Sequence, residues 1–351
     1  MKSVTYLDNA SSSFPKPPGV IRAVTRALAK TGANPNRAGH TLGRAASRIV
    51  FETREALAEL LRLPNPERII FTKNATEGIN LALKGLLRRG DKVAISGVEH
   101  NAVIRPLTGL AKRGVKVEHA PLTAQGLPDP RRIPDVKLLV TVTGSNVSGA
   151  MADIPRLAAA CRKKGVMLML DTAQTAGAVP SDFAAADIVA GTGHKALLGP
   201  QGTGFVWFRK GIEPEPLIEG GTGSFSESGS MPPFWPDRHE VPRPLHYKAW
   251  RDAVLRRASP RSQGPMSGAE GKIIVVFTTT HETMKAEKAL KAAGIKFRPT
   301  TKPRALGGSC QLALIVAPES VDMVKDETQK SGLAPEGFYT QTGAGEWRRV
   351  D

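Results

Sequence analysis

Short apolar runs alternate with amphipathic helical patterns from about residue 6 to residue 208, and this alternation constrains the fold more than any other feature. The apolar runs are continuous, which indicates strands that are buried on both faces. Strands of this kind, separated by helices, form a mostly parallel sheet that helices cover on both sides. The expected strands are 68–72, 92–95, 115–119, 137–142, 166–170, 187–189 and 204–208, and the clearest expected helices are 76–87, 101–113 and 155–164.

Two charged residues follow strands of this expected sheet, at the edge where parallel α/β sheets bind ligands. Asp171 ends the apolar run 166–170, and Lys195 closes the segment Gly191-Thr192-Gly193-His194-Lys195. A lysine amine can hold an aldehyde as a Schiff base, and a buried aspartate can keep a pyridine nitrogen protonated. Lys195 alone is compatible with a surface lysine. Together with Asp171 and Gln174 it predicts a site for pyridoxal 5′-phosphate.

The segment 72–80, Thr-Lys-Asn-Ala-Thr-Glu-Gly-Ile-Asn, follows a strand and opens a helix. Free backbone N–H groups at a helix N-terminus, together with the hydroxyl of Thr76, suit a phosphate group. Taken alone, Thr76 is an ordinary N-cap candidate. Its position in a chain that also carries Asp171 and Lys195 favours a phosphate contact.

Two further side chains are candidates for contacts with the cofactor. His100, in Glu99-His100-Asn101, could stack on the pyridine ring and act as an acid or base near neutral pH. A surface or capping histidine is an equally compatible interpretation. Asn146 could contact the O3′ region of the cofactor or the substrate, and its alternative is a turn asparagine.

These motifs together resemble the class V aminotransferase fold, in the branch of cysteine desulfurases and selenocysteine lyases. The resemblance covers residues 1 to about 230 and implies a fold-type-I large domain with a mostly parallel sheet. The matching segments are 6–10, 14–17, 34–40, 71–80, 98–101, 171–174 and 193–195.

The resemblance implies a role for each matching residue. Lys195 would bind the cofactor aldehyde and abstract the Cα proton of L-cysteine or L-selenocysteine. Asp171 would pair with the pyridine nitrogen, Gln174 would bind O3′, and His100 would stack on the ring. The remaining implied contacts are Ala75, Thr76, Thr192 and His194 around the phosphate, Thr222 reaching the phosphate of a neighbouring subunit in a homodimer, and Ala10, Arg37 and His40 on the substrate side.

Residues 241–265 depart from that branch, in which a C-terminal domain would supply a persulfide-forming cysteine and a carboxylate-binding arginine. The proline-rich, basic segment 231–271 is expected to be a linker instead. This departure indicates a truncated or frame-disrupted desulfurase. Cys161 lies on an expected amphipathic helix and is predicted to be a buried small hydrophobe rather than a nucleophile.

Residues 272–342 form a separate expected domain, and residues 343–351 are expected to be a tail. Strands at 273–277, 295–299, 311–316 and 337–340, with helices at 281–293 and 318–331, predict a small α+β ferredoxin-like fold. The segment resembles a family of selenium/sulfur carriers and places the carrier thiol at Cys310, for which a structural cysteine is the alternative. The linker would let that thiol reach over about 35 Å.

Composition and charge exclude several other classes of protein. The net charge is +17, but the basic residues are dispersed and aromatic residues make up 5%, which argues against nucleic-acid binding. No apolar run approaches a membrane span and no signal peptide is evident, so a cytoplasmic protein is expected. The 2 cysteines, Cys161 and Cys310, form neither a disulfide framework nor a metal-binding pair.

Two interpretations stay open at this point. The first is a desulfurase-like or lyase-like enzyme that passes sulfur or selenium to the tethered thiol or to an acceptor protein. The second is a catalytically impaired homologue that acts as a cofactor-binding scaffold or chalcogen carrier. An aminotransferase or another β-lyase is also compatible with Lys195 and Asp171.

Overall fold

The computed structural model describes residues 5–35, 40–146, 148–220, 235, 272–303, 306, 312–342 and 347–350. The described residues fall into two compact units. The first unit contains residues 5–29 and 52–219, and the second contains 30–51, 220, 235 and the described residues from 272 onward. The expected linker, 231–271, lies outside the described residues apart from Trp235.

The first unit is built on a 7-stranded sheet with the strand order β1-β7-β6-β5-β4-β2-β3. Neighbouring strands from β3 to β6 are parallel, whereas β7 is antiparallel to both β6 and β1. This arrangement confirms the expected mostly parallel sheet. The strands are β1 (Ile69–Thr72), β2 (Lys92–Ile95), β3 (Lys116–His119), β4 (Leu138–Val142), β5 (Met167–Asp171), β6 (Ile188–Thr192) and β7 (Gly204–Phe208).

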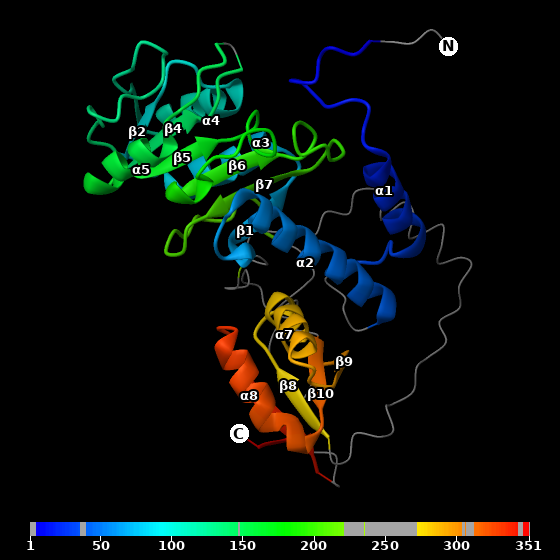
Figure 1. The fold of residues 1–351 in the computed structure, drawn as a ribbon. Coiled ribbons are helices and arrows are strands. Elements are labelled where there is room, and N and C mark those ends of the chain that lie inside the picture. Colours follow the sequence, from blue (N-terminus) through cyan, green and yellow to red (C-terminus); the bar gives the residue numbers. More distant parts are fainter. Residues whose placement is uncertain are drawn as a thin grey trace. The chain divides into compact units, whose positions relative to one another are not determined.

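Helices cover both faces of this sheet, with α5 (Ile154–Lys163) on one side and α3 (Ala75–Leu86) and α4 (Asn101–Ala111) on the other (Figure 1). The inner strands β4, β6 and β7 are buried along their length, as continuous apolar runs predict, whereas the edge strand β3 is exposed at every position. Two short 3₁₀ turns, η1 (Pro66–Arg68) and η2 (Phe183–Ala185), precede β1 and β6. Cys161 on α5 is 1% exposed and belongs to the core, and burial raises the pKa of its thiol to about 12.

Two helices precede β1 where the sequence analysis placed no element: α1 (Pro18–Lys30) and α2 (Thr41–Leu61). Residues 52–61 of α2 belong to the first unit, and Ala58 and Leu61 join its core. No residue of α1 is buried, and Ile21 and Leu28 are exposed on it. Residues 18–30 therefore form an amphipathic helix whose apolar side chains are not part of the core.

The second unit contains a 5-stranded antiparallel sheet with the order β12-β11-β8-β10-β9. Its elements follow the βαββαβ succession that the sequence predicted, which confirms a ferredoxin-like domain. β12 adds a strand within the segment that was expected to be a tail. The elements are β8 (Ile273–Val276), α7 (Thr280–Ala292), β9 (Phe297–Thr301), β10 (Leu312–Val316), η4 (Pro318–Ser320), α8 (Val321–Lys330), β11 (Gly337–Gln341) and β12 (Trp347–Arg349).

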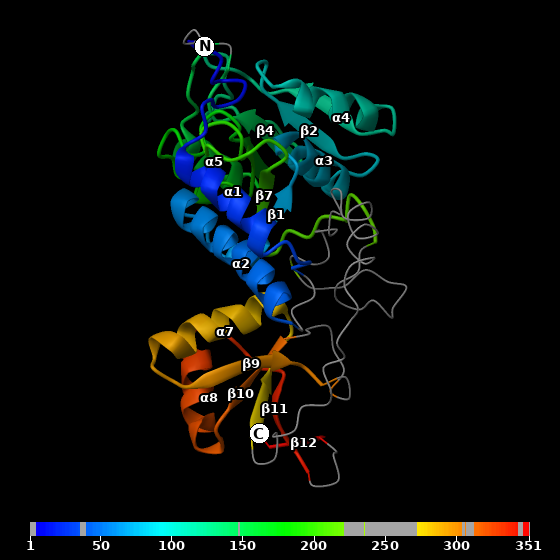
Figure 2. The same ribbon diagram turned by 90° about the vertical axis from the view of Figure 1, so that its right-hand side faces the viewer.

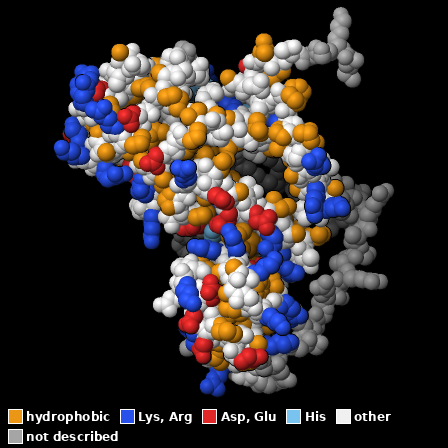
Figure 3. Space-filling model, in the orientation of Figure 1, with side chains coloured by type: hydrophobic (Ala, Val, Ile, Leu, Met, Phe, Trp, Pro, Cys, Tyr) orange, Lys and Arg blue, Asp and Glu red, His pale blue; other side chains and the backbone are white. Residues whose placement is uncertain are grey.

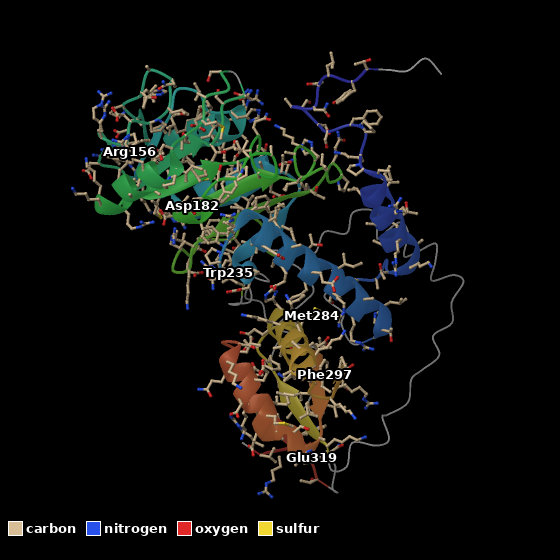
Figure 4. All side chains as sticks on the ribbon, viewed as in Figure 1. Arg156, Asp182, Trp235, Met284, Phe297 and Glu319 are labelled. Carbon is tan, nitrogen blue, oxygen red and sulfur yellow. The ribbon has the colours of Figure 1, made fainter. Side chains whose placement is uncertain are left out.

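Helices α7 and α8 lie on the same face of this small sheet (Figure 2). Val275 and Phe277 pack there against Leu290 of α7 and Val324 of α8. Met284 on α7 and Phe297 on β9 are marked in Figure 4. Helix α7 begins with a capping box, in which Thr279 and Glu282 bond each other's backbone N–H groups, and this fixes where the helix starts.

Basic side chains are dispersed over the surface of both units on the face drawn in Figure 3. Within the described ranges, no helix is long and apolar enough to cross a membrane. The same ranges hold no cluster of at least 3 His, Cys, Asp or Glu side chains that could hold a metal ion.

Candidate active site

A cavity of about 510 Å³ opens in the first unit at the carboxyl ends of its strands. The cavity brings together residues that are far apart in the sequence and that the motifs selected independently. The predicted residues that line it are Ala10, Ala75, Thr76, His100, Asn146, Asp171, Gln174, Thr192, His194 and Lys195. Asp8, Ser11, Asn74, Val142 and Gly144 also line it and were not predicted.

Strand register explains why these side chains meet. Asp171, the last residue of β5, lies beside Val142 of β4 and Ala190 of β6. Thr192 ends β6 and lies beside Gly204, the first residue of the antiparallel strand β7. The loop that follows β6 carries Lys195 to the same edge, where parallel sheets place ligand-binding residues.

Asp171 is buried, and its Oδ1 atom accepts a hydrogen bond of 3.0 Å from the backbone N–H of Ala173. Burial raises the pKa of this carboxyl, while the Ala173 hydrogen bond and the positive charge of Lys195 oppose that rise. A buried carboxylate at the cavity wall has a strong preference for a cationic partner. A protonated ring nitrogen would provide one.

Lys195 faces the same cavity. Burial lowers the pKa of its ammonium group, and the negative charge of Asp171 opposes that change. A lowered pKa increases the fraction of free amine, which is the nucleophilic form that attacks an aldehyde. The position and the charge state of Lys195 both suit covalent attachment of a carbonyl group.

The peptide carbonyl of His194, directly before Lys195, is held by the N-terminal segment. It accepts hydrogen bonds from the backbone N–H of Ser13 at 2.9 Å and from Lys16 Nζ at 3.0 Å. Lys16 Nζ also donates to Ser13 Oγ at 2.7 Å. These bonds tie residues from the start of the chain to the loop that carries Lys195, a connection that the motifs did not reveal.

The imidazole of His194 has a buried Nδ1 atom with no hydrogen-bond partner in the described part of the chain. Its pKa is lowered, first by burial and then by the positive charges of Lys195 and Lys16. A buried polar atom without a partner at a cavity wall marks a place where a ligand atom would be stabilised. A phosphate oxygen or hydroxyl meets that need.

The N-terminus of α3 contributes a second set of donors. Asn74 is the N-cap, and its side chain accepts from the N–H of Glu77 at 2.9 Å. The interpretation of Thr76 as an N-cap is therefore wrong, because Thr76 lies inside the first turn. The N–H groups of Ala75 and Thr76 fall where a helix has no internal acceptors, at the positive end of its dipole, which suits an anion.

Gly204 lets this helix start approach β7. A Cβ atom on Gly204 would lie 2.5 Å from the Cα of Asn74 and 2.6 Å from its carbonyl carbon, both of them backbone atoms. Only a residue without a side chain permits that approach. The glycine-rich segment after Lys195 thus sets the position of the α3 N-terminus.

His100 both caps α4 and lines the cavity, so the two interpretations of this residue coexist. Its Nδ1 atom accepts from the N–H of Ala102 at 3.1 Å. Because Nδ1 is an acceptor, the neutral imidazole carries its proton on Nε2. The ring is thereby oriented by the helix that it caps.

Gln174 and Ala10 are joined directly, since Gln174 Nε2 donates to the carbonyl of Ala10 at 3.3 Å. This bond holds the N-terminal segment over the cavity. Asn146 lies at the wall in a turn, so its turn position and its cavity position also coexist.

Four predicted residues are not part of this cavity as described. Arg37, Thr222 and Cys310 lie outside the described residues. His40 belongs to the second unit, where its Nδ1 accepts from the N–H of Gly43 at 3.2 Å, and it is absent from the described lining of the cavity.

The donor set fits pyridoxal 5′-phosphate. Lys195 offers an amine for the aldehyde, and Asp171 offers a buried carboxylate for the ring nitrogen. The partnerless Nδ1 of His194 and the first turn of α3 offer polar groups for the phosphate. The aldehyde, the ring nitrogen and the phosphate of the cofactor would thus each find a complementary group in a single cavity.

Comparisons with known proteins agree with this chemistry. Residues 5–230 match the family model "Aminotransferase class-V", and residues 272–340 match "Putative Se/S carrier protein-like". A probable cysteine desulfurase of Methanothermobacter thermautotrophicus is 36% identical over 253 residues, which cover 69% of this chain and 63% of that protein. Cysteine desulfurase IscS of Shewanella baltica is 32% identical over 250 residues, covering 66% of this chain and 61% of IscS. The matched part thus spans less than two thirds of these relatives.

Solved structures share the fold. The apo structure of a cysteine desulfurase from Thermococcus onnurineus has a TM-score of 0.62 at 23% identity, covering 95% of this chain and 88% of that one. The cysteine desulfurase CsdA of Escherichia coli has a TM-score of 0.57 at 23% identity, covering 94% and 95%.

Proposed function

Because this chain belongs to the class-V aminotransferase family and is homologous to cysteine desulfurases, we propose that it is a pyridoxal 5′-phosphate enzyme that removes sulfur or selenium from L-cysteine or L-selenocysteine. The observation that carries the proposal is the meeting of Lys195, Asp171 and His194 in one cavity. A solved structure with the same fold, SspA, was obtained in complex with cysteine, which supports this substrate class.

Lys195 and Asp171 would have the two main chemical roles in the site. Bound pyridoxal phosphate supplies an electron sink that weakens the bonds at the substrate Cα. The Lys195 amine would hold the cofactor and, once free, would be the base that takes a proton from Cα, since burial lowers its pKa. Asp171 would keep a proton on the ring nitrogen, because that proton would give its buried charge a cationic partner.

The other lining residues would orient the cofactor. His100 would stack on the ring with its Nε2–H directed by the bond that Nδ1 accepts from Ala102. The α3 first turn, Thr192 and His194 would hold the phosphate, and Gln174 would exchange its bond with Ala10 for one to the ring oxygen. Asn146 would contact the same ring edge or the substrate, and Ala10 would lie on the substrate side.

The cofactor site is tested by absorbance after pyridoxal phosphate is added. The unchanged protein is expected to acquire a visible band of lysine-bound cofactor and to form alanine from L-cysteine. Lys195→Ala should lose both, whereas Lys210→Ala, a change of an exposed lysine outside the cavity, should keep both. A Lys195→Ala protein that keeps the band would contradict the assignment. A band without alanine would instead support a cofactor-binding scaffold.

A thiol must receive the released sulfur, and we assign this role to Cys310. Cys161 is excluded by its burial and by a pKa of about 12, which leave it almost without thiolate at neutral pH. Transfer to a thiolate balances without an oxidant: the thiolate becomes a persulfide while cysteine becomes alanine. Cys310→Ser should abolish persulfide labelling and Cys161→Ala should not. Labelling of Cys310→Ser at the full level would exclude the role.

The family resemblance of residues 220–223 also leads us to propose a homodimer in which Thr222 contacts the partner's phosphate. Sedimentation equilibrium would give twice the mass of 37.4 kDa if the proposal holds. A monomer that binds cofactor at full strength would exclude it.

A further inference from the structure

Glu99 is a buried carboxyl beside the candidate site to which no role has been given. It lies between β2 and α4, directly before His100. Its Oε1 atom accepts hydrogen bonds from Ser96 Oγ and from the backbone N–H of Val142, the latter at 3.2 Å. Its Oε2 atom is buried and has no hydrogen-bond partner among the described residues. The carboxyl is therefore fixed at one oxygen and unsatisfied at the other.

Strand register places this carboxyl next to the ring-nitrogen site. Val142, whose N–H binds Glu99, is the β4 residue that lies directly beside Asp171 of β5. Val142, Asp171 and His100 all line the cavity. The carboxyl of Glu99 and the buried Asp171 thus meet at the same end of the strand pair β4 and β5, where Asp171 would contact the ring.

The negative charge of one carboxyl disfavours ionisation of the other. Burial raises the pKa of Glu99 to about 7, the hydrogen bond from Ser96 opposes the rise, and the negative charge of Asp171 adds to it. Lys195, after β6, places positive charge near Asp171 and favours its ionised form, whereas His100, at the start of α4, is a neutral imidazole while its Nδ1 accepts from Ala102. With its pKa near 7, Glu99 is therefore partly protonated at neutral pH.

We propose that Glu99 is a positioning residue for the ring-nitrogen site, protonated while the cavity is empty and ionised when a protonated pyridine ring binds beside Asp171. The proposal rests on the proposed function, because it requires the ring to bind there. The bound ring brings one positive charge, and the proton that leaves Glu99 goes to solvent. By linkage, ring binding then strengthens as pH rises through neutrality.

The proposal is tested by measuring the number of protons released when pyridoxine 5′-phosphate binds to the cofactor-free protein. This probe has an alcohol where the cofactor has an aldehyde, so it forms no bond to Lys195. Calorimetry at pH 7 in two buffers with different heats of ionisation gives the number of protons released. Protons exchanged by the phosphate and by His194 are common to all variants and cancel in the comparison.

The unchanged protein should release more protons than Glu99→Gln by a sizeable fraction of one proton. The difference should vanish at pH 9, where Glu99 is ionised with or without the ring. Glu118→Gln, the same substitution at an exposed position of β3, should match the unchanged protein. Ser96→Ala removes a bond that favours ionised Glu99, so it should move the maximum release to higher pH and provides a second measurement if Glu99→Gln does not fold.

Equal proton release by the unchanged protein and Glu99→Gln, with both binding the probe, would overturn the role of Glu99 and leave the proposed function intact. A release maximum that Ser96→Ala leaves at the same pH would also overturn it. Failure of the unchanged protein to bind either the probe or pyridoxal phosphate would overturn the proposed function, and with it this proposal.

Discussion

Replacing Glu99 with glutamine is expected to stabilise the cofactor-free protein above neutral pH. Glutamine has the shape of the protonated acid, keeps an oxygen to accept from Ser96 and Val142, and stays neutral at every pH. The pKa of Glu99 rises from its ordinary value of 4.5 to about 7 on folding, mainly through burial. The folded protein therefore resists an ionisation that the unfolded chain undergoes freely.

The sign and size of the expected change in unfolding free energy follow from this difference between the folded and unfolded pKa values. An acid whose pKa is higher in the folded state costs stability as pH rises above its unfolded pKa, and the full cost is reached above its folded pKa. At about 1.4 kcal/mol per pH unit, the cost amounts to about 3 kcal/mol at pH 8. It falls below about 1 kcal/mol at pH 5 and disappears below about pH 4. Glu99→Gln should gain stability with this pH profile.

Hydrogen exchange of the peptide that contains β4 measures this gain where Glu99 binds the sheet. Its opening free energy should be higher in Glu99→Gln than in the unchanged protein at pH 8, and nearly equal at pH 4. Glu118→Gln serves as the control, since Glu118 is exposed on β3. A difference between the two proteins that stays constant from pH 4 to pH 8 would refute the claim that folding holds Glu99 neutral.

Three further outcomes are expected. Gly204→Ala should destabilise the protein by about 1–3 kcal/mol, measured by urea unfolding, because the added Cβ meets the backbone of Asn74; equal stability would show that the helix start can move. Lys16→Met removes the hydrogen bond of 3.0 Å to the carbonyl of His194, so it should speed proteolysis of the N-terminal segment, as measured by mass spectrometry. An unchanged rate of proteolysis would contradict the claim that this bond anchors the segment. Asp171→Asn should weaken pyridoxine 5′-phosphate binding by about 10–100-fold in calorimetry, and full affinity would contradict ring-nitrogen pairing.

The strands of both units could be predicted because their side-chain patterns are local. Runs such as 92–95 and 204–208 coincide with β2 and β7, in which every residue after the first is apolar and buried. Helix α1 has an amphipathic pattern too, but its apolar side chains are not buried in the structure. The pattern of α1 was therefore present in the sequence and was missed, although it does not mark a core position.

Some residues of the site could be predicted from the sequence, and others could not. Asp171 and Lys195 were predictable because their chemistry is specific and each follows a strand. Glu99 was not, because its burial depends on a hydrogen bond to Val142, which is 43 positions away. The bond from Lys16 to His194 spans 178 positions and is equally invisible to a local pattern. Asn74 was passed over in favour of Thr76, although both residue types cap helices.

The pairing of β1 with β7 has a consequence for how the protein is made. Ile69 lies opposite Trp207, and β1 has its described partner only in β7. A chain emerging from a ribosome releases residues 69–72 long before residues 204–208, so β1 must wait for its partner. The contact between Asn74 and Gly204 forms at that same closure. The nascent protein therefore completes its ligand cavity only at the end of the synthesis of the first unit.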